Sequence, residues 1–134
     1  MKTLYTTKLV STTLLAGLTI FSLGCGYSKN MMPAQPGAMP TVAQLNPATG
    51  TANNSFALEV DGASFANNAV INFNGAPMAT TFVNAGKLTT TIPATAVMNA
   101  GAVPVTVTNP AVAGGRYGGG TTAMTSTPVN FTVN

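Results

Sequence analysis

The sequence predicts an all-β domain, and three observations support this class. After Thr41, short segments of alternating apolar and polar residues recur at close spacing and are separated by Gly, Pro and Asn, which is typical of a sandwich or barrel. Thr, Val, Ala, Asn and Gly are abundant, and threonine suits a pleated surface that faces water. Glu, Lys, Arg and Gln, which favour helices, are scarce.

Seven strands are expected in chain order, with one helical turn from Ala94 to Asn99 between sheets. Asn74-Gly75 follows the third strand and suits a tight hairpin turn, because both residues tolerate positive φ. Pro104 lies inside the sixth strand and predicts a bulge or an unpaired edge, because proline has no amide hydrogen. The strands are Val42–Asn46, Ser55–Asp61, Ala69–Asn74, Pro77–Val83, Gly86–Ile92, Ala102–Asn109 and Pro128–Val133.

Alternation within these strands predicts which side chains form the core. In a strand, successive side chains point to opposite faces, so every second residue faces inward. Burial of each bulky member is worth about 1.5–3 kcal/mol. The expected core residues are Phe56, Leu58, Val60, Ile71, Phe73, Leu88, Thr90, Ile92, Val103, Val105, Val107, Val129, Phe131 and Val133.

Several of these strings together resemble the IPT/TIG domain family. The resemblance implies a two-sheet sandwich of immunoglobulin-like fold with about seven strands over residues 42–134, used as a spacer or interaction module. The chain departs from the family pattern between Pro110 and Thr127, where the connection is lengthened. The strings are Leu45-Asn46-Pro47, Leu58-Glu59-Val60-Asp61-Gly62, Ile71-Asn72-Phe73-Asn74-Gly75, Leu88-Thr89-Thr90-Thr91-Ile92-Pro93 and Val105-Thr106-Val107-Thr108-Asn109-Pro110.

The N-terminal residues predict export. Lys2 and Lys8 precede an apolar run from Leu9 to Gly24, and Cys25, the single cysteine, follows it. The segment Ser22-Leu23-Gly24-Cys25 resembles a bacterial lipoprotein signal, although Ser22 stands where that family usually has Leu. We therefore expect residues 1–24 to be a signal peptide and Cys25 to carry a lipid that anchors the chain at the cell envelope or outer surface. Ordinary secretory cleavage and an uncleaved membrane helix are the alternatives.

Residues 25–41 are expected to form the lipidated N-terminus and a disordered linker. Met31, Met32 and several prolines and glycines give this stretch no periodic apolar face. Fully extended, it would hold the domain at most on the order of 50 Å from the anchor.

Composition argues against several functional classes. The chain has no histidine, and Glu59 and Asp61 are its only carboxylate side chains, so we expect no enzyme, no cofactor and no metal site. The two carboxylates alone fall short of the six or more oxygen ligands that calcium prefers. Nucleic acid is not an expected partner, because only Lys87 and Arg116 are cationic in the folded part and most of the net charge of +3 lies near the N-terminus.

The candidate binding residues are Arg116 and Tyr117, in the glycine-rich loop Ala111–Gly120. Tyr and Arg are frequent binding anchors, but a mobile solvent loop is the competing interpretation. We expect a non-enzymatic envelope or surface lipoprotein whose domain contacts the membrane through Cys25 and also an envelope protein or polysaccharide. The alternatives are a subunit of an extracellular assembly, joined by strand addition through the Val42 or Pro128 segments, and an accessory carbohydrate-binding module. The oligomeric state stays open.

Overall fold

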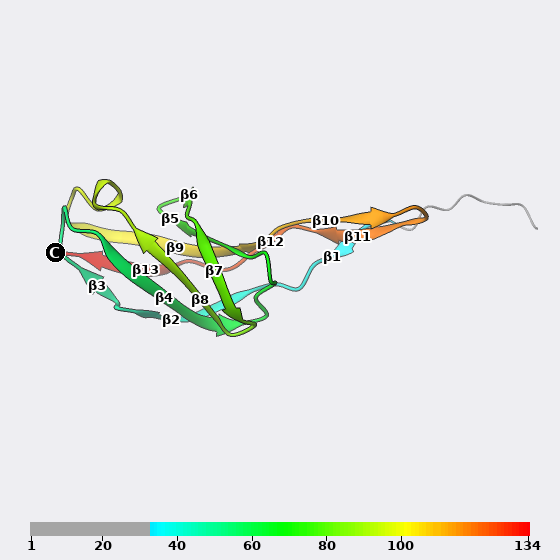
Figure 1. Cartoon of the computed structure of the whole chain (residues 1–134), viewed down its shortest axis with the longest axis horizontal. Helices are drawn as coiled ribbons and strands as arrows, with labels where there is room; N and C mark the ends of the chain where they lie inside the picture. Colours follow the sequence, from blue (N-terminus) through cyan, green and yellow to red (C-terminus); the bar gives the residue numbers. More distant parts are fainter. Residues whose placement is uncertain (1–32) are drawn as a thin grey trace, which may run out of the picture. The chain divides into compact units, whose positions relative to one another are not determined.

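The structure, a computed structural model, describes residues 33–134, which belong to one compact unit, Met32–Asn134. The predicted signal peptide (1–24) and Cys25 lie outside the described residues. The described part consists of short strands and one turn of 3-10 helix, Ala94–Ala96 (Figure 1). The strands are β1 (Gln35–Pro36), β2 (Thr41–Asn46), β3 (Thr49–Gly50), β4 (Phe56–Ala63), β5 (Val70–Phe73), β6 (Ala76–Pro77), β7 (Thr80–Asn84), β8 (Lys87–Ile92), β9 (Gly101–Asn109), β10 (Val112–Gly115), β11 (Gly118–Thr122), β12 (Met124–Thr125) and β13 (Val129–Val133).

Two of the sheets form the sandwich. The first has the order β2-β4-β8-β7, and the second has the order β3-β13-β9-β5-β6, with β12 also paired to β9. Taking β2, β4, β5, β7, β8, β9 and β13 as the first to seventh strands gives the orders 1-2-5-4 and 7-6-3. This is the constant-type immunoglobulin arrangement, so the predicted immunoglobulin-like sandwich is confirmed.

The core lies between these sheets and contains most of the predicted inward residues. Phe131 is central, because its ring stacks on Phe56 at 4.9 Å between centroids and meets the Phe73 ring edge-on at 5.6 Å. Phe56, Val103 and Val129 are partly buried against the core, and the predicted inward Thr90 is buried. The buried apolar residues are Leu45, Leu58, Val60, Phe65, Ala69, Ile71, Phe73, Leu88, Ile92, Val97, Val105, Val107, Phe131 and Val133.

The predicted fourth strand, Pro77–Val83, is divided between the two sheets. Asn74-Gly75 forms the expected hairpin turn, with φ of 52° and 80°, but the returning strand β6 pairs with β5 only at Ala76 and Pro77. The chain then crosses to the other sheet and pairs with β8 as β7. Thr80 stabilises the crossing, because its Oγ1 accepts a hydrogen bond from the Ile71 amide and donates one to the Met78 carbonyl. Strand propensity alone gives no sign of such a change of sheet.

Pro104 lies on β9, in the interior of the second sheet. It is opposite Asn130 of β13, and its carbonyl oxygen accepts a hydrogen bond from the Asn74 amide on the other side. The nitrogen and carbonyl oxygen of one residue face the same side of a strand, so the Pro104 nitrogen faces the position where β5 has already ended. The predicted unpaired position is present, although β9 is not an edge strand.

The helical turn is shorter than the expected Ala94–Asn99.

The folded domain begins earlier than the predicted boundary at Val42. Within the stretch predicted as a disordered linker, Gln35 and Pro36 pair with β11, and the Pro40 side chain is fully buried. A linker that ends before Gln35 spans correspondingly less than one that ends at Thr41. The described residues contain no helix with the length and apolar character needed to cross a bilayer.

Candidate functional site

The lengthened connection between β9 and β13 contains an ordered hairpin instead of the mobile loop considered above. β10 and β11 pair antiparallel, with Val112 opposite Thr121 and Gly115 opposite Gly118. This register leaves Arg116 and Tyr117 as a two-residue turn. β1 adds a third, parallel strand to β11, and Figure 1 shows this small sheet beyond the end of β9 and β12.

Glycine makes this hairpin possible through backbone geometry. Gly118, Gly119 and Gly120 have φ of 95°, 85° and 96°, a region that side-chain-bearing residues rarely adopt. A Cβ on Gly114 would collide with the Gly119 backbone, and one on Gly120 would collide with the Val112 carbonyl. The glycines therefore specify the conformation of the hairpin and do not make it a mobile loop.

The turn displays the two candidate residues prominently. Tyr117 is 83% exposed, and Arg116 is also exposed. On the neighbouring β10, Val112 is the one bulky apolar residue and is 53% exposed. Arg116 and Tyr117 therefore lie at the exposed turn of a hairpin that has few other large side chains.

Asn109, the last residue of β9, fixes the base of the hairpin and was not predicted as a functional residue. Its buried side-chain amide donates to the carbonyls of Ala38 at 2.7 Å and Ser64 at 2.8 Å, and its Oδ1 accepts from the Ala66 amide at 2.9 Å. The side chain thus joins the N-terminal segment, the β4–β5 connection and the start of the hairpin. An asparagine before a proline at a strand end is the only sequence signal for this role, and it equally describes an ordinary turn.

A hollow of about 270 Å³ lies beside Asn109 where these three segments meet. Its walls are mainly apolar and include Phe65, Pro110 and Val112. In the described part of the chain, every buried side-chain nitrogen or oxygen has a hydrogen-bond partner. The hollow therefore contains no unpaired buried group that would select a polar ligand.

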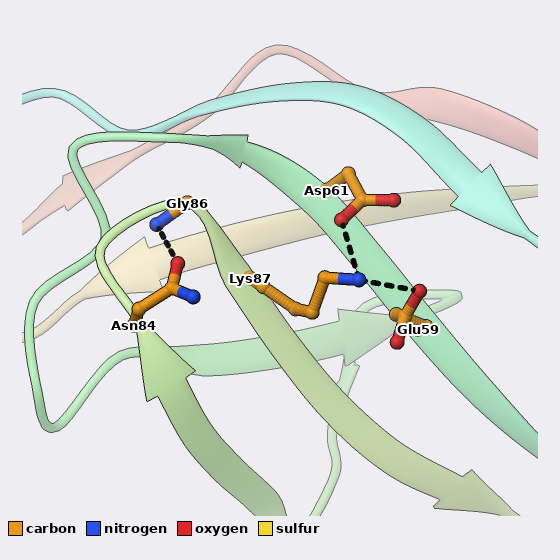
Figure 2. A network of polar contacts seen from close by, with 5 residues as sticks. All are labelled: Glu59, Asp61, Asn84, Gly86 and Lys87. Carbon is orange, nitrogen blue, oxygen red and sulfur yellow. Dashed lines mark hydrogen bonds and ion pairs between the residues drawn. The ribbon is translucent and has the colours of Figure 1, made fainter.

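The two carboxylates lie on β4 and face Lys87 on β8 (Figure 2). Lys87 Nζ is 2.8 Å from Glu59 Oε1 and 3.4 Å from Asp61 Oδ1. The hydrogen bond from Lys87 lowers the pKa of Glu59 below its ordinary value of 4.5, and the same bond raises the pKa of Lys87 above 10.5. The two carboxylates that were compared above with a calcium site thus both contact the Lys87 ammonium group. Among residues 33–134, no three His, Cys, Asp or Glu side chains gather in one place.

Two edges of the first sheet are relevant to strand addition. β2, which contains the predicted Val42 segment, forms one edge, and β7 forms the other. On β7, Phe82 is 38% exposed and Val83 is 50% exposed. β13, which follows Pro128, has β9 on one side and is met on the other by β3 at Thr132 and Val133. Of the two predicted segments, the one at Val42 therefore lies on the more open strand.

Comparison with known proteins identifies the sandwich. The family model of the IPT/TIG domain matches residues 40–133. No curated protein matches the chain. Among three matching chains of solved structures is an auxiliary nutrient binding protein from Bacteroides ovatus, with 20% identity and a TM-score of 0.46. That match covers 76% of this chain and 22% of the other, so the present chain spans about a fifth of that protein. The family match includes both sheets of the sandwich and the inserted hairpin, and the chain belongs to the IPT/TIG domain family.

Proposed function

We propose that this chain is a non-enzymatic lipoprotein of the cell envelope or outer surface, and that its immunoglobulin-like domain is an interaction module. The hairpin turn with Arg116 and Tyr117 is the observation that carries the proposal. An exposed tyrosine and arginine on a rigid scaffold have the chemistry of binding anchors, and loops on sandwich domains are frequent recognition sites. The order of the hairpin strengthens this interpretation, because less conformational entropy is lost on binding than from a mobile loop.

The anchor is the second part of the proposal. A lipid on Cys25 would hold the domain at a membrane surface, and the signal-like residues 1–24 support export. The non-enzymatic role is supported by the carboxylates, since both Glu59 and Asp61 contact Lys87 instead of facing a cavity. The chain also has no histidine, which is the most frequent general base in enzymes.

Photocrosslinking in living cells tests the proposal. A photoreactive residue at position 117 is expected to form covalent adducts with envelope components, and the same residue at Asn99 serves as the control. Asn99 is also exposed but belongs to the β8–β9 connection, at the opposite end of β9 from the hairpin. Mass spectrometry of Cys25 and membrane fractionation test the anchor in parallel. Equal crosslinking from both positions, or an unmodified chain in the soluble fraction, would contradict the proposal.

Strand addition is the second candidate, and the exposed Phe82 and Val83 on the edge strand β7 favour it. An open edge with apolar side chains is a template for pairing with another chain. Val83→Lys places a charge on this edge and should abolish concentration-dependent association if β7 is the joint. The matched change Val112→Lys, at a similarly exposed valine of the hairpin, should leave such association unchanged. A carbohydrate-binding role would instead appear as glycan adducts from position 117.

A further inference from the structure

The direction of β1 determines the side from which the N-terminal chain reaches the domain. β1 runs parallel to β11, with Gln35 beside Thr121 and Pro36 beside Thr122. β11 runs from the turn toward the sandwich, so the described chain enters β1 from the side of the turn. The attachment point of the N-terminal chain and the exposed pair Arg116 and Tyr117 therefore belong to the same end of the domain.

Covalent geometry limits how far Cys25 can be from that end. Nine residues, 26 to 34, separate Cys25 from Gln35, and this length of chain spans at most about 35 Å. Tyr117 precedes Thr121, the partner of Gln35, by four residues and so lies about 13 Å beyond it toward the turn. An extended connection that continues in the direction of β1 passes the turn and places an anchor at Cys25 about 22 Å beyond it.

The other end of the sandwich is farther from the point where the N-terminal chain joins the domain. β9 contains nine residues, Gly101–Asn109, and so extends about 27 Å from the base of the hairpin. The β8–β9 connection with Met98 and Asn99 lies at that far end. The hairpin turn is therefore nearer than the opposite loops to the point where a tether from Cys25 joins the domain.

The distribution of charge also favours the hairpin as the end that faces a membrane. Lys87 is compensated by both Glu59 and Asp61, which gives this cluster on the sandwich a net negative charge. Arg116 has no ion pair within residues 33–134, and Lys29 is four residues from Cys25 in the sequence. Anionic lipids attract cations close to the membrane surface, and arginine forms strong hydrogen bonds with phosphate. Tyrosine is enriched at membrane–water interfaces because its ring is apolar and its hydroxyl is polar.

We propose that Arg116 and Tyr117 contact the phospholipid headgroups of the membrane to which Cys25 is attached. The inference rests on the proposed function, because it takes the anchor at Cys25 as given, and it names the partner of the same hairpin. The hairpin then acts as a second membrane contact that sets the orientation of the sandwich, with the β8–β9 end directed away from the bilayer.

Fluorescence on vesicles tests this contact. The chain contains no tryptophan, so Tyr117→Trp provides a single reporter at the turn. The protein used is Cys25–Asn134, which retains the whole compact unit, and its single cysteine is coupled to a maleimide lipid in vesicles of phosphatidylcholine and phosphatidylglycerol. We expect blue-shifted emission and protection from acrylamide relative to the same protein coupled to a water-soluble maleimide. Phe82→Trp, on the edge strand β7, is the control and should show neither change.

A second variant tests the role of the charge. Arg116→Gln in the Tyr117→Trp background should lower the equilibrium constant for the shielded state about fivefold on these vesicles. The same substitution should have little effect on vesicles of phosphatidylcholine alone, because a neutral surface offers no net attraction to the cation. Equal effects on both vesicle types would contradict the assignment of Arg116 to anionic headgroups.

The outcomes separate this inference from the proposed function. If position 117 stays as accessible as position 82 on the vesicles, the headgroup contact is wrong even where cells do attach a lipid to Cys25. If position 117 becomes shielded only after an envelope protein or polysaccharide fraction is added, that partner replaces the lipid and the interaction module stands. An unmodified Cys25 in cells would remove the anchor, and with it both proposals, whatever the vesicles show.

Discussion

The sandwich and the β10–β11 hairpin are two regions of one domain that are held by different interactions. In the sandwich, strands from both sheets contribute bulky side chains that are completely buried, such as Leu58, Ile71 and Phe131. In the hairpin, all four residues of β10 are exposed, and the opposing strand is glycine-rich. Side-chain burial thus specifies the sandwich, whereas backbone conformations that only glycine readily adopts specify the hairpin.

The two regions therefore differ in which substitutions they tolerate. The sandwich accepts substitutions on its outer faces but not in its core, because the free energy comes from buried apolar area. The hairpin contains almost no buried apolar area to lose, yet it cannot accept a Cβ at Gly114 or Gly120. The two residues of its turn are free of both constraints and can vary with function.

Loss of a core aromatic ring is expected to have the largest effect. Phe131→Ala removes a side chain that is fully buried and contacts both Phe56 and Phe73. We expect the free energy of unfolding to fall by about 3–5 kcal/mol, measured by urea denaturation. Phe82→Ala is the matched control, because Phe82 is a partly exposed phenylalanine on β7, and it should cost less than about 1 kcal/mol. Similar losses at the two positions would show that burial does not specify the sandwich.

Asn109 connects the two regions, and its replacement should have the next largest effect. Asn109→Ala leaves the Ala38 and Ser64 carbonyls and the Ala66 amide without their partner. We expect a loss of about 2–3 kcal/mol in the free energy of unfolding. Amide hydrogen exchange should become faster at Ala66 and along β1.

Asn130→Ala provides the control for this prediction. Asn130 is an exposed asparagine of β13, so its replacement should change neither stability nor exchange appreciably. Unchanged exchange at Ala66 in Asn109→Ala would show that the base of the hairpin is held by other contacts.

Much of the sandwich follows from the sequence, for a physical reason. Where one face of a strand is buried and the other faces solvent, the alternation of apolar and polar residues gives the position of the strand and its inward residues, as at Phe56, Leu58 and Val60. The crossing from β6 to β7 is not visible in this way. It depends on the Thr80 hydroxyl, which accepts a hydrogen bond from the Ile71 amide of β5 and donates one to the nearby Met78 carbonyl, and threonine fits either sheet equally well.

The candidate site was predictable in its residues but not in its structure. Arg116 and Tyr117 stand out because they are the only large side chains among glycines. The ordered hairpin beneath them could not be inferred from the sequence. Glycine is depleted in strands, and it has no side chain that could reveal an alternating apolar pattern. β1 and the role of Asn109 were missed for a related reason, because both depend on contacts between segments that are distant in sequence.

A substitution in the hairpin should destabilise the hairpin without destabilising the sandwich. Gly120→Ala imposes a side chain where φ is 96° and where its Cβ would collide with the Val112 carbonyl. We expect a local cost of about 1–2 kcal/mol, seen as faster amide exchange across β10 and β11. The urea midpoint of the sandwich should stay close to that of the wild type.

Gly115→Ala is the matched control within the same hairpin. A Cβ at Gly115 would meet open space, and its φ does not lie in the left-handed region, so the hairpin should keep its exchange protection. Equal exchange rates in the two variants would mean that the glycines provide mobility rather than a required conformation. A large fall in the urea midpoint with Gly120→Ala would instead show that the sandwich depends on the hairpin.

The smallest expected effect concerns the charges on the outer face of the first sheet. The lowered pKa of Glu59 means that its contribution to stability is present above pH 4.5 and is lost as the pH falls through the folded-state value. The raised pKa of Lys87 gives the opposite case, a contribution present below pH 10.5 and lost as the pH rises further. Both side chains are about one-third exposed, so water and salt weaken the interaction.

Urea midpoints measured against pH should therefore decline slightly at both extremes, and Lys87→Met should flatten both declines. An acid-induced loss as large as that of Phe131→Ala would mean that charge, and not packing, holds the sandwich together.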